Sequence, residues 1–203
     1  MPSSLTNAYP RELEGRHSRS AIFNLLQRLS PLKHVFHLHL VGDRVDPVNI
    51  RFASQSDLKG IYLVEDDSFS EPYSHDVIAK LLRDCPSSFL VAEYPPGTII
   101  GYCVATEKWK SGHLISIGVL REYRRQGVGT RLIQRLLVAL DSRVKELRLE
   151  VKQSNTEAIT FYEELGFKQG EFIENYYEDG STAVKMLRKI DEAHPWPSRS
   201  RAK

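Results

Sequence analysis

The spacing of hydrophobic residues predicts an alternation of strands and helices between residues 48 and 190. Short apolar or alternating runs bounded by glycine, proline or serine are typical of strands, and apolar residues recurring every three or four positions are typical of amphipathic helices. On this basis we predict strands at Val48–Phe52, Ser88–Glu93, Ile99–Thr106, Leu114–Leu120, Leu147–Val151, Phe167–Phe172 and Ala183–Leu187. We predict helices from Ser54 or Ser56 to about Asp66, from Ser74 to Arg83, after Gly129 and after Asn155. This order predicts a mixed α/β fold with helices on both faces of one sheet.

The two ends of the chain do not continue this alternation. We predict an N-terminal extension of unknown role over residues 1–47, in which Ser20–Leu29 fits a short amphipathic helix and His34–Val41 alternates like a strand. The histidines of that run have only Asp43 as a nearby carboxylate, so we do not predict a metal site there. Residues 191–203 are locally basic and predict a flexible, solvated tail.

Composition bounds the class of protein. The 203 residues are 41% hydrophobic and 27% charged, with a net charge of +2, and these values are typical of a globular protein. The charge is too small to indicate nucleic-acid binding, and no apolar run is long enough to span a bilayer. Cys85 and Cys103 are the two cysteines, so we predict no disulfide framework and a reducing, cytoplasmic setting. Glu12 and Glu14 interrupt the weakly signal-like N-terminus, so we predict no targeting segment.

The segment that connects the strand at Leu114–Leu120 to the next helix carries the strongest chemical signal. It reads Arg124-Arg125-Gln126-Gly127-Val128-Gly129 and leads into a helix. The first turn of a helix has unpartnered N–H groups and the positive end of the helix dipole, so an anion docks there readily. The stretch lacks the Gly-Lys-Ser/Thr ending of a Walker loop and the G-x-G-x-x-G spacing of a dinucleotide fold. It therefore predicts a phosphate site of a different kind.

A second signal lies at the helix predicted after Asn155. Ser154-Asn155-Thr156-Glu157 offers a capping box, and Gly166 ends the helix. Residues 155–167 read N-T-E-A-I-T-F-Y-E-E-L-G-F.

Together these two stretches resemble the GNAT superfamily of acyl-CoA N-acyltransferases. The glycine loop is similar to its R/Q-x-x-G-x-G/A signature, and residues 155–167 are similar to its N-x-x-A-x-x-x-Y-x-x-x-G-F segment, in the family's order and at its distance. The resemblance covers about residues 48–190. It implies a GNAT fold: a mixed, mostly antiparallel sheet of about seven strands, with helices on both faces, splayed between the fourth and fifth strands. It also implies acetyl-CoA as co-substrate, with no metal.

The resemblance also implies which residues contact acetyl-CoA. The thioester carbonyl would lie against a strand bulge at Ile117–Val119, where Gly118 suits a close approach of backbone. The full set implied is Ile117, Gly118, Val119, Arg125, Gln126, Gly127, Val128, Gly129, Thr130, Asn155 and Tyr162.

Acetyl transfer to an amine needs a base for the nitrogen and an acid for the leaving thiolate. Glu150 shares a strand face with Arg148 and Lys152 and would point into the cleft beside the thioester, unless it belongs to a solvated, ion-paired face. His113 resembles the position from which archaeal and eukaryotic N-terminal acetyltransferases present a histidine or tyrosine, although a capping or surface role is the alternative. Tyr162 matches the tyrosine that commonly protonates the sulfur, and an ordinary helix tyrosine is its alternative. We predict that Glu150 and His113 offer parallel routes for the amine proton and that Tyr162 is the acid.

Two further segments bear on the acceptor amine. Ser70–Tyr73 and Asn175–Gly180 resemble the loops that clamp a peptide N-terminus in archaeal N-alpha-acetyltransferases and bacterial ribosomal-protein alanine acetyltransferases. On this resemblance Glu71, Tyr73, Tyr176 and Tyr177 contact the peptide. Thr182 departs from the family, which often has aspartate at that place.

The resemblance therefore implies an enzyme that acetylates the α-amino group of protein N-termini, with the ribosome or nascent chains as further candidate partners and neither a membrane nor specific nucleic acid. Two alternatives stay open: a GNAT enzyme acting on lysine or a small amine, and a non-catalytic acetyl-CoA-binding module.

Overall fold

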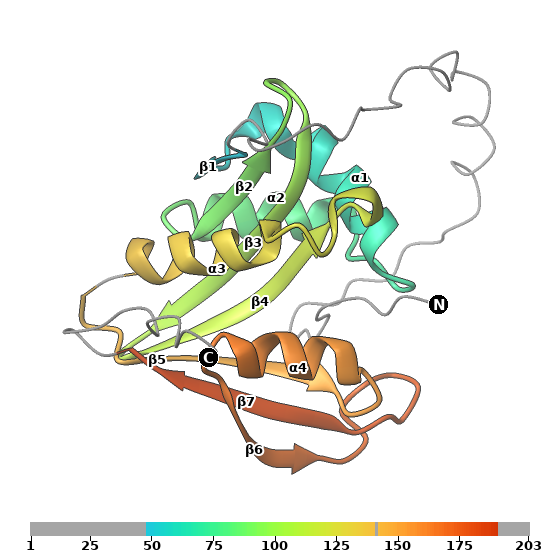
Figure 1. Cartoon of the computed structure of the whole chain (residues 1–203), viewed down its shortest axis with the longest axis vertical. Coiled ribbons are helices and arrows are strands. Elements are labelled where there is room, and N and C mark those ends of the chain that lie inside the picture. Colours follow the sequence, from blue (N-terminus) through green and yellow to red (C-terminus); the bar gives the residue numbers. More distant parts are fainter. Residues whose placement is uncertain (1–47, 141, 191–203) are drawn as a thin grey trace, which may run out of the picture. The chain divides into compact units, whose positions relative to one another are not determined.

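The computed structural model describes residues 48–140 and 142–190 (Figure 1). In chain order the elements are strand β1 (Asn49–Phe52), the 3-10 helix η3 (Gln55–Asp57), helices α1 (Leu58–Ser68) and α2 (His75–Asp84), strands β2 (Phe89–Glu93), β3 (Ile99–Lys108) and β4 (Ser111–Val119), the 3-10 helix η4 (Arg121–Tyr123), helix α3 (Val128–Ala139), strand β5 (Glu146–Lys152), helix α4 (Thr156–Glu164), and strands β6 (Lys168–Ile173) and β7 (Ala183–Lys189). Each strand and helix predicted within residues 48–190 is confirmed. The bounds of β4 differ most, because the strand begins at Ser111 and His113 lies inside it rather than at its start.

The described strands form one seven-stranded sheet in the order β1-β2-β3-β4-β5-β7-β6. β4 and β5 are parallel, whereas the other neighbouring pairs are antiparallel. The β4–β5 pairing starts at Ser111 with Glu146 and ends at His113 with Arg148, and beyond it the two strands diverge (Figure 1). The predicted mixed, mostly antiparallel sheet, splayed between its fourth and fifth strands, is therefore confirmed.

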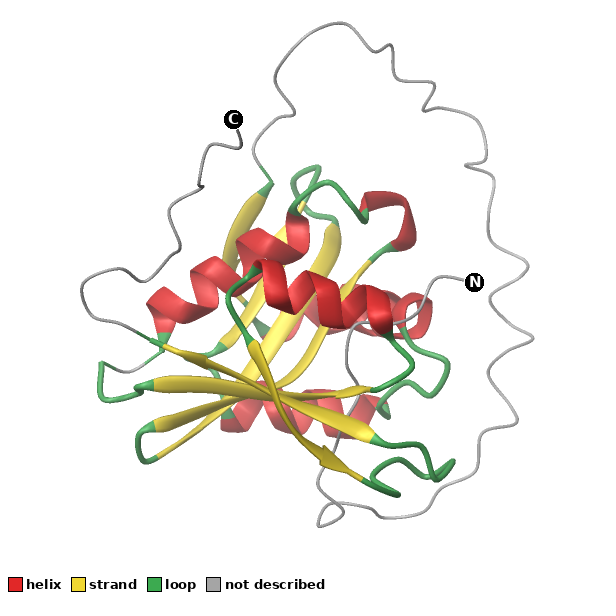
Figure 2. Ribbon diagram, turned by 60° about the horizontal axis from the view of Figure 1, so that its bottom comes forward, coloured by secondary structure: helices red, strands yellow, loops and turns green. Residues whose placement is uncertain are grey.

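Helices cover both faces of the sheet, as predicted (Figure 2). Apolar residues of α1 and α2 bury one face of β2, β3 and β4 in a cluster that includes Ile61, Val64, Ile78, Phe89 and Ile115. Apolar residues of α3 and α4 bury the other face in a larger cluster that includes Leu132, Ile133, Leu136, Leu149 and Tyr162. The 3.6-residue periodicity of each helix therefore sets which face of the sheet it covers.

A bulge changes the alternation of side chains along β4. Val104 of β3 pairs with Ser116, and the next β3 residue pairs with Leu114, so Ile115 is an extra residue. Leu114 and Ile117 consequently both belong to the α3–α4 cluster, whereas Ile115 belongs to the α1–α2 cluster. Bulges bend a strand and redirect its side chains, and this one lies where β4 leaves β5.

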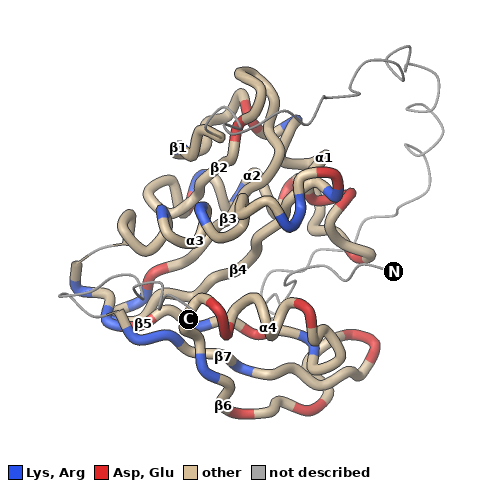
Figure 3. The backbone as a smooth tube through the Cα atoms, in the orientation of Figure 1, with Lys and Arg blue, Asp and Glu red and all other residues tan. Residues whose placement is uncertain are grey.

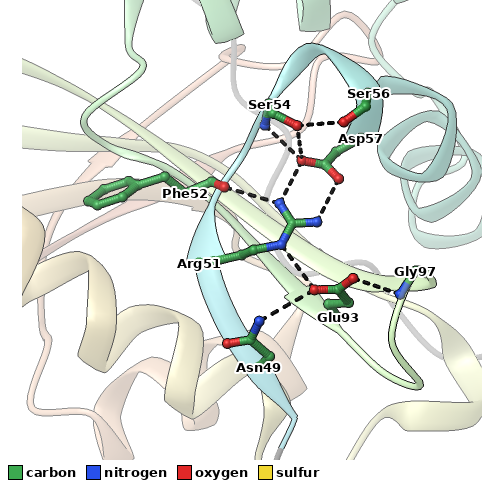
Figure 4. A network of polar contacts seen from close by, with 8 residues as sticks. All are labelled: Asn49, Arg51, Phe52, Ser54, Ser56, Asp57, Glu93 and Gly97. Atoms are coloured by element: carbon green, nitrogen blue, oxygen red, sulfur yellow. Dashed lines mark hydrogen bonds and ion pairs between the residues drawn. The ribbon is translucent and has the colours of Figure 1, made fainter.

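An ion-pair network fixes β1 at the edge of the sheet (Figure 4). The Arg51 guanidinium donates to both carboxylate oxygens of Asp57, each at 2.7 Å, and to Glu93 of β2 at 3.0 Å. Asp57 also accepts the backbone N–H of Ser54 at 2.7 Å, which completes a capping box at η3. The guanidinium of Arg51 lowers the pKa of Asp57 to about 2. Because these contacts join β1, η3 and β2, they stabilise this edge of the domain.

Several predictions fall outside the described residues: the helix at Ser20–Leu29, the strand at His34–Val41 with its histidines, and the basic tail. Among residues 48–140 and 142–190, no helix has the length and apolar character needed to cross a membrane. The same residues contain no group of three or more His, Cys, Asp or Glu side chains placed to hold a metal ion.

Candidate active site

The two predicted base residues lie in direct contact where β4 and β5 part. His113 is in the last residue pair of the parallel ladder, opposite Arg148, and Glu150 lies two positions further along β5 on the same face. The Nε2 atom of His113 and the Oε2 atom of Glu150 are 2.5 Å apart. Both residues are buried, with 8% and 4% of their surfaces exposed. The alternatives of a surface histidine and a solvated glutamate are therefore wrong.

The surroundings of Glu150 favour its carboxylate form. Burial by itself would raise the pKa of Glu150, but the hydrogen bond with His113 and the charges of His113, Arg148 and Lys185 outweigh it, so the pKa is lowered. An ionised Glu150 accepts a hydrogen bond from the Nε2–H group of His113, and in this tautomer of the neutral imidazole the other ring nitrogen carries the lone pair. The pair can therefore orient an imidazole base and stabilise the cation that forms on it.

The β6–β7 turn brings Tyr176 and Tyr177 to this pair. Burial raises the pKa of Tyr176 above its ordinary value, and the charge of Glu150 together with a hydrogen bond to it raises it further. The two tyrosine rings meet edge to face with 5.2 Å between centroids. The Tyr177 hydroxyl is buried and has no hydrogen-bond partner among the described residues. Because buried polar groups are nearly always paired in native proteins, this hydroxyl is a candidate contact for a substrate.

Lys152 and Asp179 hold the turn in place. Lys152, at the end of β5, bonds to Asp179 at 2.8 Å and lies 4.9 Å from the centre of the Tyr177 ring. Asp179 also accepts the backbone N–H and the hydroxyl of Ser181. Lys152 therefore pairs with the turn rather than with Glu150.

The glycine loop has the conformation that its sequence predicts. Gly127 is the N-cap of α3 with a φ of 80°, and Arg125 before it has a φ of 61°. Left-handed φ values favour glycine because a Cβ atom is strained there. A Cβ atom on Gly129 would lie 3.2 Å from Phe161 of α4, so this glycine permits the packing of α3 on α4. The loop thus presents the N-terminal amides of α3, as an anion site requires.

Basic residues gather along the η4–α3 segment (Figure 3). Arg124 donates to the carbonyl of Val119 at 2.8 Å and lies 3.6 Å from the Asp67 carboxylate. Asp67, in the last turn of α1, also accepts the backbone N–H of Arg121 at 2.7 Å. The segment between η4 and the glycine loop is therefore attached to both β4 and α1.

The bulge in β4 differs from the predicted one. It lies at Ile115, before the predicted Ile117–Val119 stretch, whose residues pair regularly with β3. A Cβ atom on Gly118 would lie 2.9 Å from the Ser68 hydroxyl and 3.1 Å from Val64. Helix α1 is therefore the element that packs closely against Gly118.

Asn155 is the N-cap of α4 and Tyr162 lies within this helix, and both make structural contacts. The side chain of Asn155 caps the helix by accepting the N–H of Ala158 at 3.1 Å. Tyr162 is completely buried in the core and packs against Phe161 and Phe167. Their predicted roles, contact with the cofactor arm and proton donation to sulfur, stay predictions.

The α1–α2 loop contains the remaining predicted substrate residues. Glu71 is exposed and Tyr73 is half-buried. The backbone N–H of Tyr73 donates to Glu65 of α1 at 2.7 Å, a residue that the sequence reasoning missed. The available signal was an acidic residue beside Val64, on the apolar side of an amphipathic helix.

Comparison with known proteins decides the family. The model of the Acetyltransferase (GNAT) family matches residues 57–167, more than half of the chain. The chain belongs to the GNAT family. The match runs from the start of α1 through the glycine loop to the end of α4, so it contains both motifs on which the resemblance rested.

This GNAT chain is similar to N-terminal acetyltransferases in particular. An N-alpha-acetyltransferase of Sulfurisphaera tokodaii is 34% identical over 155 residues, covering 70% of this chain and 92% of that protein. The structure of Ard1 from Thermoplasma volcanium matches with a TM-score of 0.67 and 32% identity, covering 71% of this chain and 98% of that one. The Escherichia coli ribosomal-protein-S18-alanine N-acetyltransferase matches with a TM-score of 0.62 and 27% identity, covering 76% and 98%. The predicted resemblance to both groups is confirmed.

A further structure bears on the co-substrate. The NatB acetyltransferase complex, whose structure contains CoA, matches with a TM-score of 0.62 and 25% identity, covering 70% of this chain and 99% of that one. Similar GNAT structures therefore bind CoA, which agrees with the predicted acetyl-CoA.

Proposed function

We propose that this GNAT enzyme transfers the acetyl group of acetyl-CoA to the α-amino group of protein N-termini. The observation that carries the proposal is the buried His113–Glu150 pair beside Tyr176 at the parting of β4 and β5. The names of the relatives support the same reaction. Residues 48–190 form the proposed catalytic domain, residues 1–47 an extension and residues 191–203 a basic tail.

In the proposed mechanism, His113 accepts the proton of the attacking amine. Glu150 is ionised because its pKa is lowered, so it holds Nε2 of His113 as a donor. The other ring nitrogen then takes the amine proton directly or through a water, and the imidazolium is stabilised by Glu150. The demand on this base is modest, since an α-amino group has a pKa of roughly 7.7–8.0 and is partly neutral at pH 7.

The donor side of the proposed site is the glycine loop and β4. Backbone amides at Arg125–Thr130 bind the acetyl-CoA phosphates at the N-terminus of α3. The thioester lies along Ile117–Val119 in the opening between β4 and β5, where backbone N–H groups polarise its carbonyl. Tyr162 donates its hydroxyl proton to the leaving thiolate and regains a proton from solvent, to which His113 releases the amine proton; Asn155 contacts the cofactor arm.

The acceptor side of the proposed site consists of two loops. The buried hydroxyl of Tyr177 and the ring of Tyr176 contact the first residues of the peptide, and Tyr73 and Glu71 contact it from the α1–α2 loop. Tyrosine suits this task because its ring packs on a side chain while its hydroxyl bonds to peptide groups. Nascent chains at the ribosome are the proposed cellular substrates, and the cytoplasm is the proposed location.

Matched peptides test the proposal. One peptide has a free α-amine and no lysine, and its partner has the same sequence with an acetylated N-terminus and one added lysine. With labelled acetyl-CoA we expect transfer to the first peptide and none to the second. Efficient acetylation of the second peptide would replace the proposal with a lysine acetyltransferase, and acetylation of neither, with acetyl-CoA bound, would favour a non-catalytic module.

A further inference from the structure

The last turn of α1 carries a buried carboxyl group that the proposed mechanism does not use. Glu65 is 1% exposed. Its Oε1 atom accepts the backbone N–H of Tyr73 at 2.7 Å, and its Oε2 atom accepts the hydroxyl of Tyr102 from β3. The Tyr102 hydroxyl is also 2.7 Å from the hydroxyl of Ser116 on β4. One chain of hydrogen bonds therefore runs from the α1–α2 loop, through Glu65, to β4.

The two ends of this chain lie at the two sides of the proposed reaction. Ser116 directly follows the bulge residue Ile115 and immediately precedes Ile117–Val119, the β4 stretch assigned to the thioester. Tyr73 belongs to the loop assigned to the acceptor peptide. Within this series of hydrogen bonds, the side chain of Glu65 makes the connection between the backbone of the α1–α2 loop and the sheet.

Burying a carboxyl group is costly unless its oxygens are hydrogen-bonded. Burial raises the pKa of Glu65 to about 7, and the hydrogen bonds from Tyr102 and Tyr73 act against that rise. An apolar residue would fill this place at a lower desolvation cost, but it could not accept the N–H of Tyr73. A fully satisfied polar network specifies one arrangement of its members.

Other contacts keep the ends of the same loop fixed. The ring of Tyr62 stacks on His75 with 3.8 Å between centroids, which joins α1 to the start of α2. Phe69 is buried at the beginning of the loop, and Ser74 caps α2 at its end. Just before the second of these anchors, the contact of Glu65 with Tyr73 sets where the last part of the loop lies relative to β4.

We propose that Glu65 is a positioning residue for the acceptor: it holds the α1–α2 loop in register with β4, so that the bound amine meets the thioester. The inference rests on the proposed function, which makes this loop part of the acceptor site. Glu65 contacts neither substrate in this scheme and acts through Tyr73 and Tyr102. Its loss should therefore affect the peptide and leave acetyl-CoA binding unchanged.

Steady-state kinetics on the full chain tests the inference with three variants. Glu65→Ala removes both contacts, Glu65→Gln keeps the size and one acceptor oxygen, and Tyr102→Phe removes the link to Ser116. For Glu65→Ala we expect kcat/KM for the peptide to fall about 10- to 100-fold, as for other small misplacements of a reactant. Glu65→Gln should recover part of this loss, and KM for acetyl-CoA should stay at the parent value.

Asp57→Asn is the matched control. Asp57 is another buried, hydrogen-bonded carboxylate, but it lies in the network at the β1 edge. The control should lower the melting temperature without changing kcat/KM for the peptide. If Glu65→Ala and Glu65→Gln behave like this control, Glu65 is structural and the inference is overturned; an equal rise of KM for acetyl-CoA would overturn it as well.

Amide hydrogen exchange separates this inference from the proposed function. In the free protein, the Tyr73 amide should exchange at least about tenfold faster in Glu65→Ala than in the parent, because its acceptor is removed. If the parent acetylates a lysine or small amine instead of an α-amine, the proposed function fails, and kcat/KM for that amine replaces the peptide measurement. Unchanged Tyr73 exchange in a folded Glu65→Ala protein would overturn the inference whichever amine is the substrate.

Discussion

The 2.5 Å contact between His113 and Glu150 makes a quantitative prediction about how the two residues act together. From the sequence they are parallel routes for the proton, so each single variant should keep partial activity and the double variant should lose far more. Their hydrogen bond leads us to propose that they act in series instead. If Glu150 works by orienting and stabilising His113, removing Glu150 matters only while His113 is present.

The magnitudes follow from the chemistry of the acceptor. A general base contributes a factor of about 10² to 10⁴ in rate, and we expect the lower end because an α-amine near pH 8 is already half neutral. His113→Ala should therefore lower kcat/KM about 100-fold and Glu150→Gln about 30-fold. Independent effects would multiply to about 3000-fold, whereas a serial pair should show about 100-fold in the double variant. The difference corresponds to a coupling energy of about 2 kcal/mol.

The assay is initial-rate kinetics with a free α-amine peptide at saturating acetyl-CoA, on the four proteins of the double-mutant cycle. Glu146→Gln, at the paired end of β5, is the control and should keep the parent rate. The parent rate should rise toward a pH of roughly 8 as the amine becomes neutral, while the lowered pKa of Glu150 keeps this carboxylate ionised. A double variant whose loss equals the product of the single losses would refute the serial scheme and show independent effects, and a loss larger than that product would restore the parallel scheme.

Four further variants test other parts of the structure. Gly127→Trp should abolish acetyl-CoA binding in calorimetry, because residue 127 has a φ of 80° at the N-terminus of α3; a folded variant that binds as well as the parent would show that the phosphate site is elsewhere. Tyr162→Phe should lower kcat about 100-fold with the fold kept, and an unchanged turnover would make Tyr162 a core residue only. Tyr177→Ala should raise KM for the peptide more than it lowers kcat, since it removes binding common to the ground and transition states; the opposite split would argue against a binding role. Asp57→Asn should lower the free energy of unfolding by about 1–3 kcal/mol at pH 7 in urea denaturation. Because the folded pKa of Asp57 is lowered to about 2, the parent should lose this contribution to its stability as the pH falls from roughly 4 through 2. The variant lacks the contribution, so its free energy of unfolding should fall less over the same pH range. Equal stabilities of parent and variant at pH 7 would contradict this assignment.

The sequence was sufficient for the parts of the fold that local rules determine. Three residues mark helix ends for local reasons. Gly127 and Gly166 adopt positive φ values, which favour glycine, and the side chain of Asn155 accepts a backbone N–H in the first turn of α4. Strand and helix periods identified each β-strand and each α-helix in residues 48–190, but not the two short 3-10 helices. The position of the bulge was missed by a few residues, since it depends on how β3 and β4 pair rather than on a residue preference.

The site was predictable as a set of residues but not as a geometry. His113 and Glu150 could be chosen from strand alternation and resemblance, yet their direct hydrogen bond depends on the parallel register that places His113 opposite Arg148. Glu65 was overlooked because its partners, the Tyr73 amide and the Tyr102 hydroxyl, come from a loop and a distant strand. Long-range pairing of this kind has no local sequence signal.

The parting of β4 and β5 also bears on aggregation. An unpaired strand edge is a template for pairing with another chain, and proteins usually shield such edges at the rim of a sheet. Here the ladder between two central strands stops at His113 and Arg148, so the edges of both strands that lie beyond this pair face each other inside the sheet. A strand of a second molecule that paired with them would have to enter between β4 and β5. The domain therefore keeps extended backbone available for a narrow, strand-like ligand while giving foreign chains no such edge on its exterior at this place.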